Sequence, residues 1–162
     1  MDNSTPAVRA PSPLLRVVSG NDRFGEQRGL GVSTLAFKLS ALDSSGIFIV
    51  ENTFHARGGP ARHLHYAQDE WFYVLEGEFL MEVGAERTTL KAGDSVFAPR
   101  QVPHVWAHVG HGRGRILITF TPAGQMEAFF REVTKVDAMP AQDPALWQAH
   151  GMALLGPPLP LT

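Results

Sequence analysis

Residues 58–70 read GGPARHLHYAQDE, and this stretch does most to decide the fold and the chemistry of the chain. It places His63 and His65 two positions apart inside a segment that we expect to be a strand. Side chains at i and i+2 of a strand leave the same face, because the side-chain period is two residues. Both imidazoles are therefore able to reach a single point.

Glu70 begins the next expected strand and shares a face with Phe72 and Val74. Its carboxylate therefore projects inward among apolar neighbours. Burying an ionised carboxylate without a counter-charge is strongly unfavourable. A dication beside Glu70 would supply that counter-charge.

A fourth donor comes from residues 93–104, which read GDSVFAPRQVPH. A turn, a short apolar strand and a second, proline-bounded turn deliver His104 onto a new strand. Three neutral imidazoles and one carboxylate suit Fe, Mn, Co, Ni, Cu or Zn better than Mg or Ca, which favour shells made only of oxygen. We therefore expect one divalent transition metal ion bound by His63, His65, Glu70 and His104.

These residues and their spacing resemble the two conserved motifs of the cupin superfamily. The first motif has His-x-His, four residues, Glu, six residues and Gly, which His63, His65, Glu70 and Gly77 match. The second has Gly, five residues, Pro and then His, which Gly93, Pro99 and His104 match. Two motifs with correct spacing in one chain are much more specific than either alone.

The chain departs from the cupin pattern at three positions that shape turns or support the site. Arg57 stands where the first motif opens with glycine, although Gly58 and Gly59 follow at once. Gln101 replaces the glycine expected two residues after the proline of the second motif, and His108 replaces its closing asparagine. The four candidate ligands are unaffected.

The resemblance implies an all-β fold, the double-stranded β-helix or jelly-roll barrel, with one or two C-terminal helices. The C-terminal region also looks like small single-domain cupins described as quercetin-dioxygenase-like. By that analogy Glu70 would be both a metal ligand and the catalytic base that accepts a substrate hydroxyl proton, after which O2 opens the ring.

We expect the chain to divide into a flexible leader (1–13), a cupin-like barrel (14–122), a C-terminal helical segment (123–155) and a Pro-rich tail (156–162). Short segments rich in β-branched and aromatic residues, separated by Gly or Pro, predict the strands. They are residues 14–18, 33–40, 46–55, 61–65, 70–75, 78–83, 87–90, 95–98, 104–108 and 115–120.

Two helices are expected after the barrel. Met126, Phe129, Phe130 and Val133 recur at three- and four-residue steps, the pattern of an amphipathic helix, which we expect to pack on the outside of the barrel. A second, short helix is predicted between Asp143 as N-cap, with Pro144 at the first helical position, and Gly151 just past its end.

Composition limits the partners. The 162 residues suit one domain, and 44% hydrophobic with 19% charged residues is ordinary globular usage. A net charge of −2 without a basic run argues against nucleic acid and anionic membranes. With no cysteine, a metal must be held by His and carboxylate, and a cytoplasmic location is expected.

Three further side chains are candidates for a substrate pocket. Trp106 shares a face with His104, Phe72 shares one with Glu70, and Tyr66 directly follows His65. His108 lies about 13 Å along the strand from His104, too far to bind the same ion. Packing of the helix, rather than a cofactor site, is the expected role of the Met126 stripe.

The function predicted from these features is that of a metal-dependent dioxygenase, similar to quercetinase, acting on a small aromatic or enolisable substrate with O2. A non-redox isomerase, cyclase or lyase, and a small-molecule-binding module without catalysis, are the alternatives. A homodimer is expected because the N-terminal strands, residues 14–42, would be able to pair across subunits.

Overall fold

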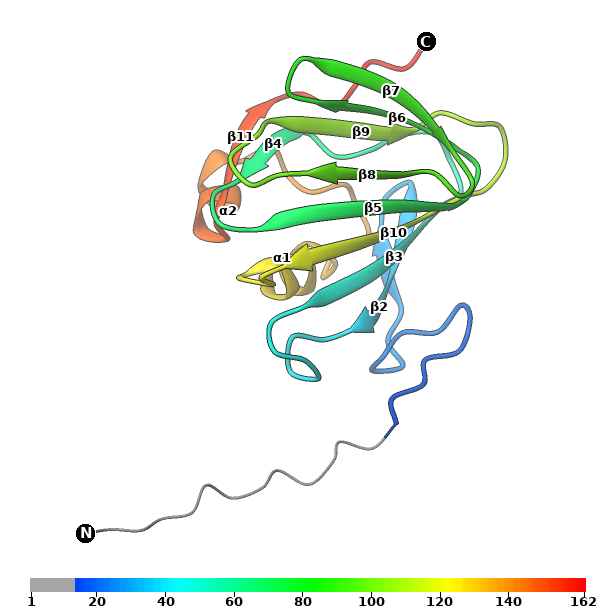
Figure 1. Cartoon of the computed structure of the whole chain (residues 1–162), viewed down its shortest axis with the longest axis vertical. Coiled ribbons are helices and arrows are strands. Elements are labelled where there is room, and N and C mark those ends of the chain that lie inside the picture. The colour runs from blue at the N-terminus through cyan, green and yellow to red at the C-terminus, as the bar shows by residue number, and fades with distance from the viewer. Residues whose placement is uncertain (1–13) are drawn as a thin grey trace, which may run out of the picture.

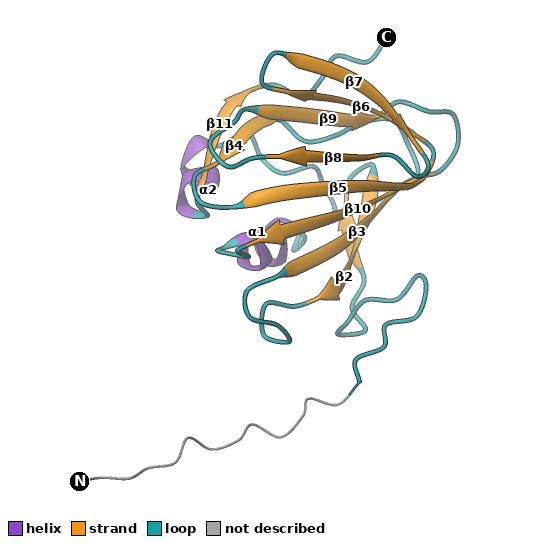
Figure 2. Ribbon diagram, viewed as in Figure 1, coloured by secondary structure: helices purple, strands orange, loops and turns teal. Residues whose placement is uncertain are grey.

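Two antiparallel sheets form the protein, with two short helices at one side (Figures 1 and 2). This computed structural model describes residues 14–162, so the leader predicted over residues 1–13 lies outside the described part of the chain. The all-β jelly-roll architecture with C-terminal helices confirms the predicted fold class.

The elements follow one another along the chain with these bounds: β1 Arg28–Leu30, β2 Ser33–Leu39, β3 Phe48–Phe54, β4 Arg62–His65, β5 Asp69–Glu76, β6 Glu78–Val83, β7 Glu86–Lys91, β8 Ser95–Ala98, β9 His104–His108, β10 Gly114–Thr121, α1 Met126–Val133, α2 Pro144–Ala149 and β11 Met152–Gly156.

Strands that are distant in sequence lie side by side. The six-stranded sheet has the order β1-β2-β3-β10-β5-β8, and the five-stranded sheet has the order β11-β4-β9-β6-β7. In the larger sheet β10 pairs with both β3 and β5, which places Ile118 opposite Val50 and Phe72. All three side chains are buried. The core therefore lies between the inner faces of the two sheets.

Nine of the ten predicted strands correspond to β2–β10, with ends that differ by at most two residues. The strand predicted at residues 14–18 is wrong, because this segment is irregular. Leu14 is 93% exposed there. The β-branched residues of segment 14–18 favour a strand, but no neighbouring strand pairs with this segment. Two strands were not predicted, β1 and β11.

The predicted cap of α2 is confirmed, whereas the predicted packing of α1 is not. The side chain of Asp143 caps α2 by accepting a hydrogen bond from the Ala145 amide at 3.1 Å, as predicted. The prediction that α1 packs on the outside of the barrel is wrong. Phe130 of α1 contacts Phe48 and Phe120, whose side chains lie on the inner face of the larger sheet. The apolar stripe of α1 thus completes the interior.

Within residues 14–162, no helix combines the length and the apolar character needed to cross a bilayer.

Asp22 attaches the N-terminal segment to the larger sheet. Its carboxylate accepts hydrogen bonds from the Phe24 and Phe37 amides, both at 2.8 Å, and from Arg28 Nε at 3.1 Å. Burial alone raises the pKa of Asp22, but the hydrogen bonds and the Arg28 charge outweigh it and lower the pKa below 3.8. A carboxylate whose pKa is lowered by folding stabilises the folded state. This stabilisation is fully present above the pKa that the group has in the unfolded chain, and it is lost as the pH falls through the lower pKa of the folded protein.

Replacing Asp22 with asparagine should therefore lower the free energy of unfolding by about 2 kcal/mol at pH 7, because the buried Arg28 loses its buried charged partner and keeps only the more exposed Glu26. Urea denaturation should show this difference shrinking below about pH 4. Asp69→Asn is the control, since the Asp69–Arg100 pair lies at the surface and contributes at most about 1 kcal/mol. A difference that stays constant down to pH 2 would contradict this assignment.

Candidate metal centre

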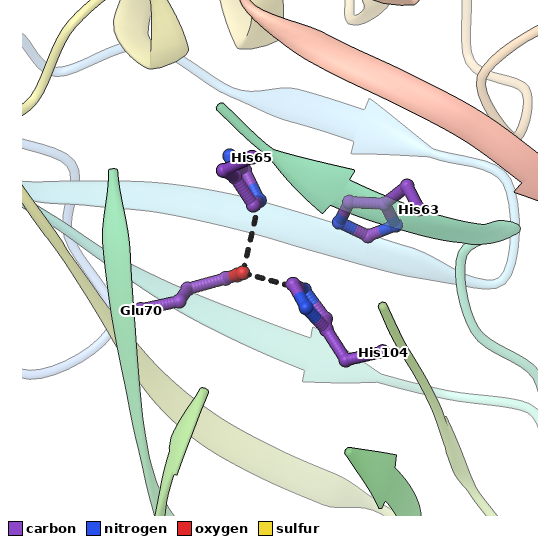
Figure 3. A group of neighbouring side chains, drawn as sticks. All are labelled: His63, His65, Glu70 and His104. Atoms are coloured by element: carbon purple, nitrogen blue, oxygen red, sulfur yellow. Dashed lines mark ion pairs between the residues drawn. The ribbon is translucent and has the colours of Figure 1, made fainter. Parts of the chain in front are cut away.

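His63, His65, Glu70 and His104 converge between the two sheets (Figure 3). The two histidines of β4 and His104 of β9 come from the smaller sheet, and Glu70 of β5 comes from the larger one. All four side chains are buried, with exposed fractions of 5% or less. The two sequence motifs are therefore brought to one point.

Strand pairing explains why these side chains meet. His63 stands directly opposite His104 in the β4–β9 pair. Residues His63 and His65 are two apart on β4 and face the same side, as the period of two requires. Glu70 lies opposite Phe120 and Ala98 on the inner face of the larger sheet, so it faces the imidazoles across the interior.

The donor atoms point to a common centre rather than to hydrogen-bond partners. Glu70 Oε2 lies 3.0 Å from His65 Nε2 and 2.7 Å from His104 Nε2. Despite these ion-pair distances, none of the three atoms has hydrogen-bond geometry with any partner in residues 14–162. Buried polar atoms without partners are uncommon and costly, so the site is incomplete as a set of side chains alone.

The spacing of the donors fits a transition metal ion. One potential ligand atom from each of the four residues lies within 4.8 Å of the others. Ligand atoms about 2.1 Å from one ion are separated by at most about 4.2 Å. A movement of about half an ångström therefore closes the set around an ion.

Backbone carbonyls orient two of the imidazoles. His63 Nδ1 lies 2.7 Å from the Ala61 oxygen, and His104 Nδ1 lies 3.3 Å from the Val102 oxygen. A carbonyl oxygen only accepts, so each Nδ1 carries the proton in the neutral ring and each Nε2 keeps its lone pair. This outer arrangement is typical of metal-binding histidines.

The electrostatics of the cluster favour deprotonated ligands at two of the four positions. Burial, together with the neighbouring His104 and His65, lowers the pKa of His63 to about 3. Burial raises the pKa of Glu70, but the adjacent His65 and His104 lower it by more, so its pKa lies well below 4.5. Burial lowers the pKa of His104 and the Glu70 charge raises it, with a net rise above 6.5. His63 and Glu70 are thus ready to bind a cation at neutral pH.

A small cavity of about 50 Å³ opens beside these residues. His63, His65 and Glu70 form one wall of it. The remaining lining is mostly apolar and comprises Leu30, Phe54, Pro60, Trp106, Met126, Phe129, Phe130, Met139, Pro140, Trp147 and Met152, with the polar Ser33 and Asn52. The centre therefore faces a small, mostly apolar cavity.

The three pocket residues expected from the sequence occupy different places. Trp106 lines the cavity. Phe72 is fully buried next to His104 and Trp106, with ring centroids 6.1 and 5.7 Å away, but does not line the cavity. Tyr66 is 48% exposed and lies outside the lining.

Other lining residues were not recognised from the sequence. The apolar stripe of α1 was interpreted as helix packing, yet Met126, Phe129 and Phe130 also line the cavity. Asn52 carried a usable signal, because it is a polar residue at an inward position of a strand whose other inward positions are apolar.

Two of the positions that depart from the motifs, Gln101 and His108, differ in their structural roles. Gln101 adopts a left-handed backbone with φ of 65°, the conformation for which glycine is favoured, and its amide donates to the His65 oxygen at 2.7 Å. His108 is fully buried between Phe54 and Phe79, with ring centroids 5.8 and 5.3 Å away, and is not part of the ligand cluster.

Comparisons with known proteins agree with this arrangement. A family model described as a cupin domain matches residues 51–120. An RmlC-like cupin structure from Shewanella frigidimarina is 30% identical, with a TM-score of 0.52 over 63% of this chain and 87% of that one. KdgF from a Halomonas species shares the fold at 22% identity and a TM-score of 0.52, over 60% of this chain and 86% of that one.

Curated relatives have no assigned function. An uncharacterized protein of Methanocaldococcus jannaschii is 35% identical over 60 residues, which is 37% of this chain and 48% of that protein. The chain spans about half the length of the curated relatives that it matches.

Proposed function

This chain belongs to the cupin superfamily, and on this basis we propose that it is a metal-dependent dioxygenase for a small aromatic or enolisable substrate. One observation carries the proposal. Four buried donors meet at one point, the ligand atoms of His65, Glu70 and His104 lack hydrogen-bond partners, and His63, His65 and Glu70 line a mostly apolar cavity.

The donor set defines the cofactor by class. Three imidazoles and one carboxylate suit Fe, Mn, Ni, Co, Cu or Zn. Such an ion, when bound, polarises a substrate oxygen, and all of these metals except zinc add redox chemistry with O2. His63, His65, Glu70 and His104 would hold it.

Glu70 is proposed as the catalytic base as well as a ligand. Its carboxylate is the only acid or base other than histidine among the described residues that line the cavity. It can accept the proton of a substrate hydroxyl that approaches the centre. The apolar walls, including Phe54, Trp106 and Trp147, exclude water from the ionised substrate.

The same lining favours dioxygenase chemistry over the non-redox alternatives. An isomerase or lyase commonly moves protons between a base and a separate acid. Among residues 14–162, the cavity lining contains no Lys, Arg, Asp or Tyr that is able to act as that second group. An apolar cavity also admits O2, which is itself apolar.

Oxygen uptake tests the proposal. Metal-free protein is loaded separately with Fe, Mn, Co, Ni, Cu and Zn and mixed with catechol, kojic acid and flavonol in an oxygen electrode. At least one redox-active form should consume O2 with one of these compounds, and the zinc form should consume none. Glu70→Gln, compared at equal metal occupancy, should be slower by roughly 100-fold or more.

Failure of every metal form to consume O2 would contradict dioxygenase activity. Product formation by the zinc form without O2, seen by NMR, would favour an isomerase, cyclase or lyase. Retention of the compounds without turnover would favour a binding module. A homodimer and a cytoplasmic location stay predictions that native mass spectrometry and cell fractionation test.

A further inference from the structure

Two polar side chains interrupt the apolar part of the cavity lining. Ser33 of β2 is 1% exposed and Asn52 of β3 is 4% exposed. Asn52 shares its face of β3 with the buried Val50 and Phe54, and Ile116 stands opposite it on β10. An apolar residue would satisfy packing at this position, so the amide requires another explanation.

The hydrogen bonds of this pair leave capacity on both residues. Asn52 Nδ2 donates to Ser33 Oγ and to the Thr34 carbonyl oxygen, both at 2.9 Å. Because the carbonyl only accepts, the nitrogen of the amide must face it, and both amide hydrogens are used. Within residues 14–162, no donor is paired with Asn52 Oδ1, and the Ser33 hydroxyl proton has no acceptor.

A free acceptor and a free donor therefore stand side by side in the cavity. Asn52 Oδ1 is not among the fully buried atoms that lack a partner, so it faces accessible space, where a ligand is able to reach it. One group that both donates and accepts would satisfy both at once. A hydroxyl group has this property, whereas a carboxylate or a phosphate only accepts.

The charges around the pair select a neutral group. Among the described residues, the cavity lining has no Lys or Arg to balance an anion away from the metal centre, and no Asp to balance a cation. The only carboxylate among the described lining residues is that of Glu70, which belongs to the metal centre.

Strand register separates the pair from the metal centre. Phe48, Phe120 and Glu70 form one row across β3, β10 and β5. Asn52 is four residues further along β3, which is about 13 Å, and two strands away from β5, which is about 10 Å. The Cα atoms of Asn52 and Glu70 are thus roughly 16 Å apart by strand geometry.

We propose that Ser33 and Asn52 form a second polar subsite, which binds a neutral hydroxyl at the end of an elongated, mostly apolar substrate whose opposite end reaches the metal centre. This inference rests on the proposed function, because it assumes that the substrate oxygen binds at the ligand cluster. It names Ser33 and Asn52 as specificity residues, without a part in the chemical step.

Matched probes that differ by one hydroxyl test the subsite. Cobalt-loaded protein is titrated under nitrogen, and the cobalt absorption spectrum reports binding. The long pair is flavonol and its derivative with a hydroxyl at the para position of the pendant phenyl ring. The short pair is allomaltol and kojic acid, and both compounds are too short to reach Ser33 from the metal. The hydroxyl should tighten binding roughly three- to tenfold in the long pair and leave the short pair unchanged.

Two variants separate a subsite from a structural link between β2 and β3. Ser33→Ala should remove the gain from the hydroxyl, and Ser33→Thr should keep it, with unchanged cobalt stoichiometry in both. A purely structural role would change stability but not the affinity ratio of the two long probes.

Equal affinity for the two long probes in the unmodified protein would overturn the inference and leave the proposed function intact. The same conclusion would follow if Ser33→Ala still bound the hydroxylated long probe more tightly than the other. If no probe perturbs the cobalt spectrum, the proposed function fails, and the inference fails with it.

Discussion

Replacing His104 with alanine should weaken binding of a divalent transition metal by more than about 100-fold, because it removes one of four ligands from a preformed buried centre. His104 Nε2 is 2.7 Å from Glu70 Oε2, and no other described residue replaces it in the cluster. Isothermal titration of chelator-treated protein with Zn and Co measures the affinity. Tag-free protein is required, since an affinity tag binds the same metals.

His111→Ala is the matched control for His104→Ala. His111 is exposed and lies outside the ligand cluster, so its removal should leave metal affinity unchanged. Circular dichroism should show that both variants remain folded. If His104→Ala binds one equivalent of metal as tightly as the unmodified protein, His104 is not a ligand.

Replacing Gly59 with alanine should lower the free energy of unfolding by roughly 3 kcal/mol or more. A Cβ at this position would lie 1.9 Å from the Trp106 carbonyl oxygen and 2.8 Å from Ala107 Cα. Both atoms belong to the backbone of β9, which also carries His104, so the strand must move. Thermal unfolding should show a melting temperature lower by about 6–12 °C.

Gly156→Ala is the control for steric effects. Neither Gly59 nor Gly156 has a positive φ, and a Cβ at Gly156 would meet the Arg62 side chain at ordinary distances, 3.7 Å to Cβ and 3.9 Å to Cδ. Its stability should change by less than about 1 kcal/mol. Equal stability of Gly59→Ala and Gly156→Ala would contradict the close approach of residue 59 to β9.

Most of the barrel could be predicted because its signals are local. Alternation of apolar and polar residues sets which face of a strand each side chain occupies, and it placed Glu70, Phe72 and Val74 inward, where the structure buries them. The paired spacings of the two motifs then made His63, His65, Glu70 and His104 candidates for one centre. The structure brings the four together, and their binding of metal stays a proposal.

Strand β11 was beyond prediction because its formation depends on a distant partner. Residues 152–156 read MALLG, and Met, Ala and Leu are good helix formers. Pairing with β4 decides the outcome, with Met152 opposite His65 and Leu154 opposite His63. This contact joins segments about 90 residues apart, so a local sequence pattern does not predict it.

Of the two residues of the proposed polar subsite, only Asn52 could be predicted from the sequence. The period of two places Asn52 on the inner face of its strand with Val50 and Phe54, which is an unusual place for an amide. Its partner Ser33 lies on another strand, and their meeting follows from the register of β2 against β3. Register is a property of the assembled sheet, so the sequence pattern does not specify the pair.

The proposed function requires a metal ion at the four-residue centre, and anomalous diffraction from crystals of tag-free, metal-loaded protein tests this most directly. Data on both sides of the absorption edge should show one peak about 2.0–2.3 Å from an imidazole nitrogen of each of His63, His65 and His104 and from a Glu70 oxygen. An empty centre in protein that carries one equivalent of metal elsewhere would contradict it.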